Sequence, residues 1–150
     1  MILNHTKVDQ IIDRDARGSF IKELVIVRTR SKSGVEVPLS MVRKRRASAS
    51  ETRAPVLLIH GYGQNRYAWH LPSRSFSNHL AQAGFDVFNL DLRGHGRSRH
   101  LGARRPSHIT DFVREDVPAA VDEVRRLSGN RPVFLVGHSL GGLVSYAAAG

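Results

Sequence analysis

The residue types best suited to chemistry lie near the end of the sequence, where glycines at 137 and 141 flank Ser139 in the pattern Gly-x-Ser-x-Gly. An apolar run precedes the pattern and a helix-forming stretch follows it, so Ser139 is predicted at a sharp turn between a strand and a helix. Such a turn strains the serine backbone and leaves no space for side chains two positions away, which explains Gly137 and Gly141. A serine presented in this way is typical of a nucleophile that attacks an acyl carbon.

Two backbone N–H groups are candidates for binding the oxyanion that such an attack creates. The N–H of Leu140 would lie at the N-terminus of the following helix, where the helix dipole also favours negative charge. The N–H of Tyr62 lies in the sequence HGYG at 60–63, directly after another apolar run, and the glycines keep this loop open. We therefore predict a main-chain oxyanion hole at Tyr62 and Leu140.

A nucleophilic serine needs a histidine as its base and an acid that orients the histidine. Eleven residues follow Ser139, none of them is Asp, Glu or His, and all eight histidines precede it. His138 would point away from its neighbour Ser139. His60 and His95 lie at predicted strand ends, where hydrogen bonds that brace loops are favoured over a role as base.

Other polar and aromatic residues lie near the same strand ends. Asp91 ends a predicted strand at the edge where ligands bind in open α/β sheets, but a structural contact with Arg93 or Arg97 is favoured. Tyr67 and Trp69 are candidates for an apolar substrate pocket, with plain loop packing as the alternative. No His or carboxylate cluster has metal-ligand spacing, and the glycines lack the spacing of a dinucleotide site, so we expect no metal and no cofactor.

The elements that position these residues alternate along the second part of the chain. Continuous apolar runs at 55–60, 86–91 and 132–136 predict strands buried on both faces. Apolar residues at helical spacing predict helices over 73–83 and 110–127, each ended by a glycine. Pro118 predicts a kink, so the second segment is either one long helix or two short ones, and 143–149 forms the last helix. This alternation predicts an α/β fold with a mostly parallel sheet and helices on both faces.

The N-terminal part has a different pattern. Apolar and polar residues alternate over 20–40 on either side of Ser-Lys-Ser-Gly at 31–34, which predicts an antiparallel hairpin buried on one face. Residues 43–54 are rich in Arg, Ser and Ala and are predicted to form a turn or linker. Residues 1–19 are treated as an N-terminal extension.

Three segments together resemble one known family: HGYGQN at 60–65, GFDVFNLDLRGHGRS at 84–98 and VGHSLGG at 136–142. Over residues 20–150 the chain resembles the N-terminal half of α/β-hydrolase fold proteins of the serine esterase and lipase type. The resemblance implies an α/β-hydrolase domain that is incomplete and ends after the helix that follows the nucleophile elbow. Epoxide hydrolases and haloalkane dehalogenases of this family carry aspartate at the position of Ser139. The serine in this chain instead favours acyl transfer to water over those two reactions.

The resemblance also implies a mechanism and a substrate class. Ser139 would attack a carboxylic ester, either a small molecule or a lipid, and form an acyl-enzyme. In this family the acid and the histidine follow the serine, so the 150-residue chain is expected to be nearly inactive. The alternative is a catalytically inactive α/β-hydrolase-like module that binds or interacts, for example through an unpaired edge of the strand at 132–136.

Composition limits the other classes of function. The chain carries a net charge of +10, much of it within 28–53, but that segment lacks the interleaved aromatic residues that stack on bases. A solvated basic segment is favoured over a nucleic-acid site. Charged residues interrupt the N-terminus where a signal peptide would be apolar, no run is long enough for a membrane span, and no cysteine occurs. These features predict a cytoplasmic protein without a transmembrane segment.

Overall fold

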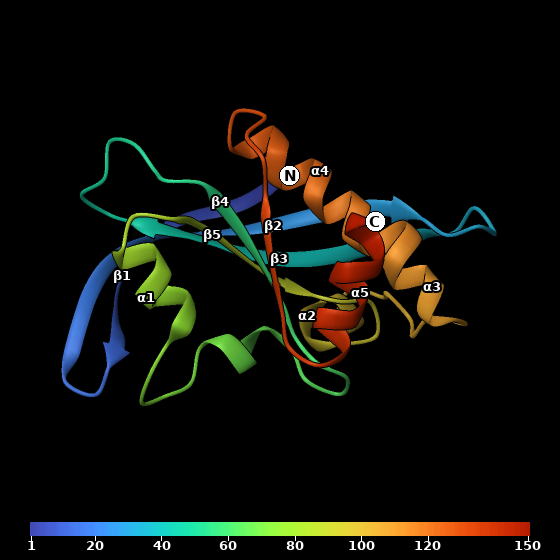
Figure 1. Cartoon of the computed structure of the whole chain (residues 1–150), viewed down its shortest axis with the longest axis horizontal. Helices are drawn as coiled ribbons and strands as arrows, with labels where there is room; N and C mark the ends of the chain where they lie inside the picture. The colour runs from blue at the N-terminus through green and yellow to red at the C-terminus, as the bar shows by residue number, and fades with distance from the viewer.

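The computed structural model describes all residues from 1 to 150 and contains one six-stranded mixed sheet with helices on both faces (Figure 1). The first four strands in sheet order pair antiparallel, and the last three pair parallel. The strand order is β1 (Ile2–Asp13), β2 (Ala16–Arg30), β3 (Glu36–Arg46), β5 (Asp86–Asp91), β4 (Pro55–Ile59) and β6 (Phe134–Gly137). The predicted α/β fold class is confirmed.

The N-terminal residues belong to this sheet. Residues 1–19, expected as an extension, contain β1 and the start of β2, which pair antiparallel. Most of β1 is exposed, so the strand buries few apolar side chains and its sequence lacks a regular apolar pattern. Backbone pairing with β2, rather than a buried face, makes this segment a strand.

The predicted hairpin is present as β2 and β3, with Arg30 opposite Glu36 across the turn. Two expectations about it are wrong. Residues 43–46 are strand rather than linker, and residues 24–27 are all buried, so the hairpin is covered on both faces. The sequence did not predict this end of β3 because Arg43 is charged, and a charged residue is not expected inside a strand buried on both faces. In the fold, Asp86 and Glu23 neutralise its charge.

Helix α1 (Phe76–Gln82) lies within the predicted 73–83 but begins three residues later, and Gly84 follows it with a φ of +99°. Its buried face differs from the prediction. Phe76 is 42% exposed, whereas Ser77, Asn78 and Ala81 are buried. Asn78 turns inward because it accepts a hydrogen bond from a buried lysine of β3, described below.

The second predicted helix is continuous but not uniform. It consists of α3 (Ile109–Asp111), a π-helical turn η2 (Phe112–Asp116) and α4 (Val117–Leu127). Pro118 is the second residue of α4, so the irregularity expected from proline occurs in the π-helical turn just before this helix. The remaining elements are η1 (Arg66–Trp69), α2 (Gly96–His100) and α5 (Leu140–Ala149), the last of which begins three residues before the predicted 143–149.

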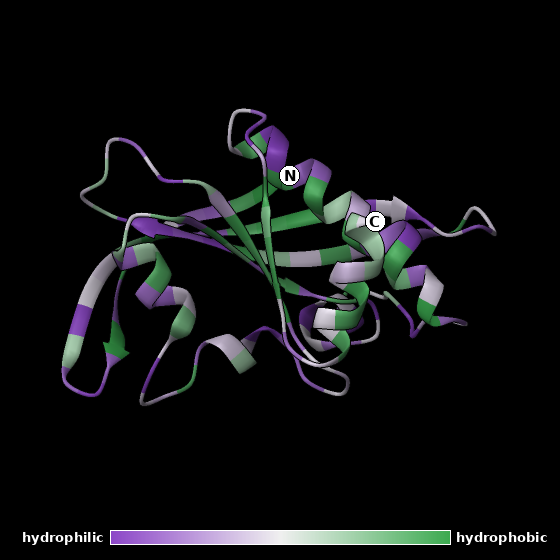
Figure 2. Cartoon of the chain, in the orientation of Figure 1, coloured by the Kyte–Doolittle hydropathy of each residue, from purple (hydrophilic) through white to green (hydrophobic).

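Two apolar clusters cover opposite faces of the sheet, whose centre is hydrophobic (Figure 2). Leu57 and Ile59 of β4 face the larger cluster, which includes side chains of α4 and α5. Their neighbours Val56 and Leu58 face the smaller cluster under α1. Strand β6 lies at the sheet edge, and its Phe134 is 61% exposed, so the prediction of a fully buried strand is wrong there. None of the helices combines the length and the apolar character needed to cross a membrane.

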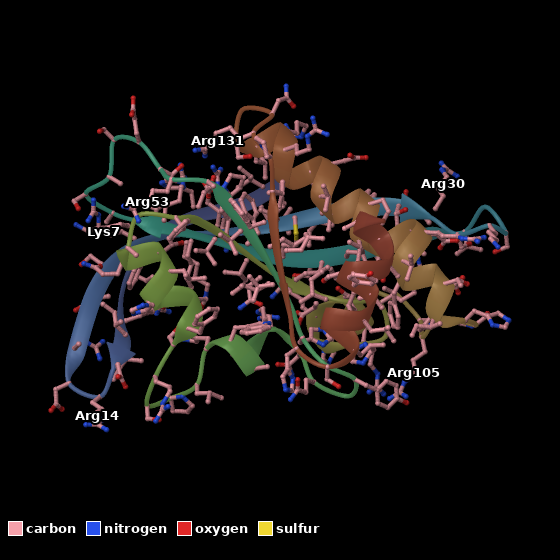
Figure 3. All side chains as sticks on the ribbon, in the orientation of Figure 1. Lys7, Arg14, Arg30, Arg53, Arg105 and Arg131 are labelled. Carbon is pink, nitrogen blue, oxygen red and sulfur yellow. The ribbon has the colours of Figure 1, made fainter.

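The positive charge does not form one basic face. The labelled basic side chains in Figure 3 lie around the whole outline of the molecule. Within 28–53, Arg43 and Lys44 are buried and Arg28 pairs with Glu36.

A buried ion pair joins the segment after β5 to the π-helical turn. The Nε of Arg93 donates to Asp116 at 2.7 Å, its backbone N–H donates to the same carboxylate at 3.0 Å, and both side chains are buried. The Arg93→Met variant is expected to lower the free energy of unfolding by about 3–5 kcal/mol, because Asp116 would keep a buried charge without a partner. Urea denaturation of the full-length protein measures this loss.

The matched control is Arg126→Met, since Arg126 is exposed and pairs with Glu123 at the surface. Its loss of stability should stay below about 1 kcal/mol. Equal losses in the two variants would contradict the structural role assigned to the buried pair.

Candidate active site

Ser139 occupies the turn between β6 and α5. Its backbone has a φ of 53° and a ψ of −114°, a conformation that residues with side chains rarely adopt. Holding a non-glycine residue there costs about 1–3 kcal/mol, so the surrounding structure must enforce it. A strand, this turn and a helix follow one another in the predicted order, although the helix begins earlier than predicted.

Gly137 and Gly141 are required by the contacts of this turn. A Cβ atom on Gly137 would lie 2.3 Å from the backbone carbon of Gly141. A Cβ atom on Gly141 would lie 2.0 Å from the carbonyl oxygen of Ile59, at the end of β4. The N–H of His138 donates to the same Ile59 carbonyl at 3.1 Å. The turn is therefore packed, backbone against backbone, on the end of β4.

His60 is buried directly after β4 and makes two hydrogen bonds. The backbone N–H of Leu92 donates to its Nε2 at 3.1 Å, so Nδ1 carries the proton and donates to the carbonyl of Gly61 at 2.8 Å. Burial lowers the pKa of His60, which favours this neutral form. Both ring nitrogens are occupied, so His60 braces the ends of β4 and β5.

His95 acts in the same way from the next loop. Its Nε2 accepts from the N–H of Gly63 at 3.1 Å, and its Nδ1 donates to the carbonyl of Arg93 at 2.9 Å. The rings of His60 and His95 lie 4.9 Å apart. The two histidines thus fix the loop that contains Tyr62, in agreement with the loop-bracing role inferred for them.

Tyr62 and Leu140 both have a backbone N–H without an acceptor in the structure. Their loops are neighbours, because a Cβ atom on Gly61 would lie 3.2 Å from Nδ1 of His138. Both unpaired N–H groups thus belong to segments that adjoin the Ser139 turn.

Gln64 is a residue that sequence reasoning missed. Its Oε1 accepts from the N–H of Gly61 at 3.0 Å and lies 3.3 Å from Nδ1 of His138. Gln64 therefore links the loop after β4 to the turn before Ser139. Gln64 belongs to the segment HGYGQN, in which the sequence predicted roles for the glycines and for Tyr62 but not for Gln64.

Asp91 is fully buried and has structural partners, as predicted. It accepts from the N–H and the guanidinium of Arg66 at 2.7 and 2.5 Å, and from the N–H of Arg97 at 3.0 Å. The predicted contact with Arg93 or Arg97 is therefore made by Arg97, while Arg93 pairs with Asp116. Asp91 holds η1 against the end of β5.

Tyr67 and Trp69 are not brought together with Ser139 in one cavity. Tyr67 lines a cavity that contains no residue of the segment 134–150. Trp69 packs against the ring of Phe76, with the ring centres 5.6 Å apart. No group of three or more His, Asp or Glu side chains is arranged to hold a metal ion.

Comparison with known sequences agrees with the fold described above. A family model described as alpha/beta hydrolase fold matches residues 54–150. The chain is 36% identical over 91 residues to (E)-2-((N-methylformamido)methylene)succinate hydrolase of Acinetobacter baylyi, which covers 61% of this chain and 30% of that protein. It is 31% identical over 111 residues to epoxide hydrolase 3 of Xenopus tropicalis, covering 73% of this chain and 28% of that protein.

Lipase member K of Mus musculus is 31% identical over 105 residues, which cover 64% of this chain and 26% of that protein. The chain spans less than a third of the length of these three relatives.

Among solved structures, an esterase from Thermogutta terrifontis superimposes with a TM-score of 0.59 and 25% identity, covering 84% of this chain and 40% of the esterase. A cold-adapted esterase from an Arctic intertidal metagenomic library has a TM-score of 0.62 at 17% identity, covering 97% of this chain and 60% of that one. The second likeness shows the fold alone. Since the family model matches most of the chain and the solved structures share its fold, this chain belongs to the α/β hydrolase fold family.

Proposed function

We propose that this chain carries the nucleophile and the oxyanion hole of a serine hydrolase that acts on carboxylic esters. The observation that carries the proposal is the strained backbone of Ser139, held at a strand-to-helix turn by glycines that no other residue can replace. Strain of this kind persists only where the fold enforces it, and it is common at active sites. The esterases and lipases among the relatives support the same reaction class.

The proposed mechanism begins with attack of the Ser139 hydroxyl on the acyl carbon of the ester. The oxyanion that develops accepts hydrogen bonds from the N–H groups of Tyr62 and Leu140, and the alcohol leaves with a proton. Water then cleaves the acyl-enzyme and releases the acid. His60 and His95 have no free ring nitrogen, so neither is assigned as the base in this proposal.

Esters are favoured over epoxides because of what each substrate would leave on the enzyme. Attack of a serine hydroxyl on an epoxide would form an alkyl ether, which has no carbonyl for water to attack. Attack on an ester forms an acyl-serine, which water can cleave. With Ser139 at the turn, only the second route regenerates the enzyme.

The test is labelling of the full-length protein with a fluorophosphonate, a reagent that phosphonylates activated serines. We expect one adduct by intact mass, located at Ser139, together with turnover of a chromogenic short-chain ester. The Ser139→Ala variant should show neither. A folded full-length protein without labelling or turnover would instead support the inactive binding module.

A further inference from the structure

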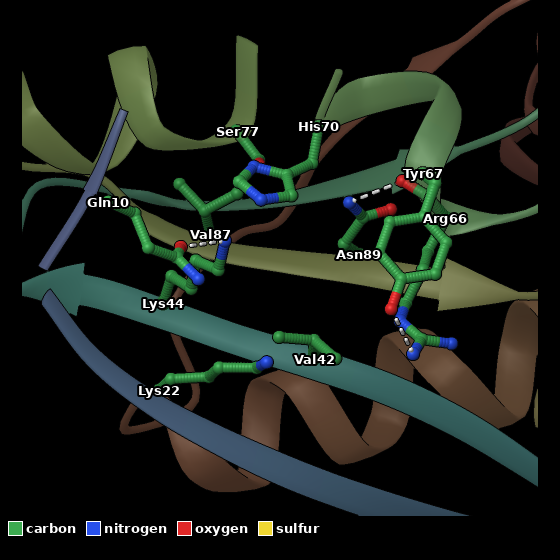
Figure 4. A pocket seen from close by; sticks show the side chains of 10 residues that line it. All are labelled: Gln10, Lys22, Val42, Lys44, Arg66, Tyr67, His70, Ser77, Val87 and Asn89. Carbon is green, nitrogen blue, oxygen red and sulfur yellow. Dashed lines mark hydrogen bonds between the residues drawn. The ribbon is translucent and has the colours of Figure 1, made fainter. Parts of the chain in front are cut away.

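A cavity of about 240 Å³ lies on the face of the sheet that α1 covers (Figure 4). Its walls come from β1, β2, β3, β5, α1 and the segment around η1. No residue of β6, the Ser139 turn or α5 contributes to it. It is smaller than the roughly 300–1,000 Å³ of pockets that hold drug-sized ligands, so its occupant must be small.

The charged residues that line the cavity are all basic. They are Lys22, Lys44 and Arg66, and no carboxylate lines the same space. Arg66 is neutralised by Asp91, whereas neither lysine takes part in an ion pair. Two lysine side chains therefore face a confined space in which the protein supplies no counter-ion.

Lys44 is held in place by amide oxygens. It is 5% exposed, and its Nζ donates to Gln10 at 2.7 Å and to Asn78 at 2.9 Å. The amide nitrogen of Asn78 donates to the carbonyl of Ile11 at 2.9 Å, which fixes its oxygen toward Lys44. Figure 4 shows Lys44 beside Gln10 and directed toward the cavity. A protonated Lys44 has a third N–H, for which the protein supplies no acceptor.

The other end of the cavity offers an acceptor. Asn89 also lines the cavity, and its buried Oδ1 accepts no hydrogen bond. Its amide nitrogen donates to the carbonyl of Arg66 at 2.9 Å, so the oxygen is the free end. Val42 and Val87 supply apolar surface in the same space. Buried polar groups without partners are rare in folded proteins, which indicates a ligand or ordered water here.

We propose that this cavity binds a small organic carboxylate that also carries a hydrogen-bond donor. The carboxylate accepts from Lys44 and lies close to Lys22, the short carbon body contacts Val42 and Val87, and a hydroxyl group donates to Oδ1 of Asn89. This site is separate from Ser139 and does not depend on the proposed esterase activity.

Binding should take up a proton near neutral pH. Burial, with repulsion from Lys22 and Arg66, lowers the pKa of Lys44 to about 7. A bound carboxylate favours the charged form, so affinity should fall as the pH rises above about 7. His70 also lines the cavity, but burial lowers its pKa to about 4, and it stays neutral in this range. Arg66, which contributes to this repulsion, is itself paired with Asp91.

The experiment is calorimetric titration of the full-length protein with L-lactate, propionate and inorganic phosphate. We expect lactate to bind most tightly, because propionate lacks the hydroxyl and phosphate lacks the apolar body. Titrations at pH 6 in buffers with different ionisation enthalpies should show little proton uptake, and at pH 8 they should show uptake close to one proton. Phosphate binding as tightly as lactate, or no binding of lactate at tens of millimolar, would overturn the proposal.

Variants locate the site. Lys44→Met should weaken lactate binding at least tenfold and remove the proton uptake. Lys22→Met replaces it as the test if Lys44→Met does not fold, and should weaken lactate binding severalfold. The matched control is Lys32→Met, an exposed lysine in the β2–β3 turn, which should bind as the wild type does. Ser139→Ala should bind lactate normally, and Lys44→Met should still react with the fluorophosphonate. Equal affinity in wild type and Lys44→Met would contradict the assignment.

Discussion

Replacing Ser139 by glycine in the full-length protein is expected to abolish ester hydrolysis and, at the same time, to stabilise the fold. Removal of the nucleophile in serine hydrolases lowers kcat on the order of a millionfold, which leaves only the effects of binding and of the oxyanion hole. The gain in stability follows from the φ of 53° at Ser139, which glycine adopts without a clash. We expect the free energy of unfolding to rise by about 1 kcal/mol, after the larger entropy of glycine in the unfolded chain is subtracted.

Ser139→Ala is the matched variant, because it removes the hydroxyl and keeps the Cβ atom and hence the strain. Its kcat should fall as far as that of Ser139→Gly, while its stability should stay close to that of the wild type. Steady-state kinetics and urea denaturation of the three proteins measure both effects. Two outcomes would contradict the proposal: activity retained by either variant, or no difference in stability between them.

Gly141→Ala is expected to prevent folding, or to lower the free energy of unfolding by more than about 4 kcal/mol. The added Cβ atom would lie 2.0 Å from the carbonyl oxygen of Ile59 and 2.6 Å from that of His60. Both atoms belong to the backbone at the end of β4, so relief requires that the central strand or α5 moves. A flexible side chain could give way at small cost, but a paired strand cannot.

Gly142→Ala provides the control one residue further along α5. The nearest atom to its added Cβ is the carbonyl oxygen of Gly137, at 3.4 Å, and its backbone has no positive φ. Alanine in a helix is favoured over glycine by about 0.5–1 kcal/mol, so this variant should be as stable as the wild type or slightly more stable. Circular dichroism and urea denaturation compare the pair. Similar losses in both variants would show that the contact with β4 is not the cause.

Both predictions concern the contact between the Ser139 turn and the end of β4. The backbone of the Ser139 turn lies against the end of β4, and the loop with the free N–H of Tyr62 begins at the same strand end. Nδ1 of His60 donates to Gly61 in that loop, Nε2 of His95 accepts from Gly63, and Oε1 of Gln64 accepts from Gly61. The proposed nucleophile and oxyanion hole therefore share their support with the core of the parallel sheet.

The sequence by itself determined the parallel part of the fold and the turn at Ser139. The strands at 55–60 and 86–91 were readable because both of their faces are buried, which leaves continuous apolar runs. The turn was readable because its geometry excludes every residue except glycine at 137 and 141. The steric requirement of the turn is local, and burial acts on every side chain of a central strand alike. Both requirements therefore leave a pattern in consecutive residues.

Only the tertiary structure decided the polar parts of the interior. Strand β1 exists through its pairing with β2, the end of β3 is buried because Arg43 meets Asp86 from β5, and Asn78 faces inward because Lys44 lies opposite. Asp91 likewise pairs with Arg66 rather than with Arg93. The sequence does not distinguish a polar residue that is buried with a partner from one that is exposed to solvent. The partners of Arg43, Lys44 and Arg66 lie 25 to 43 positions away along the chain. Their burial is set by how the chain folds back on itself, and that information is absent from any short window of sequence.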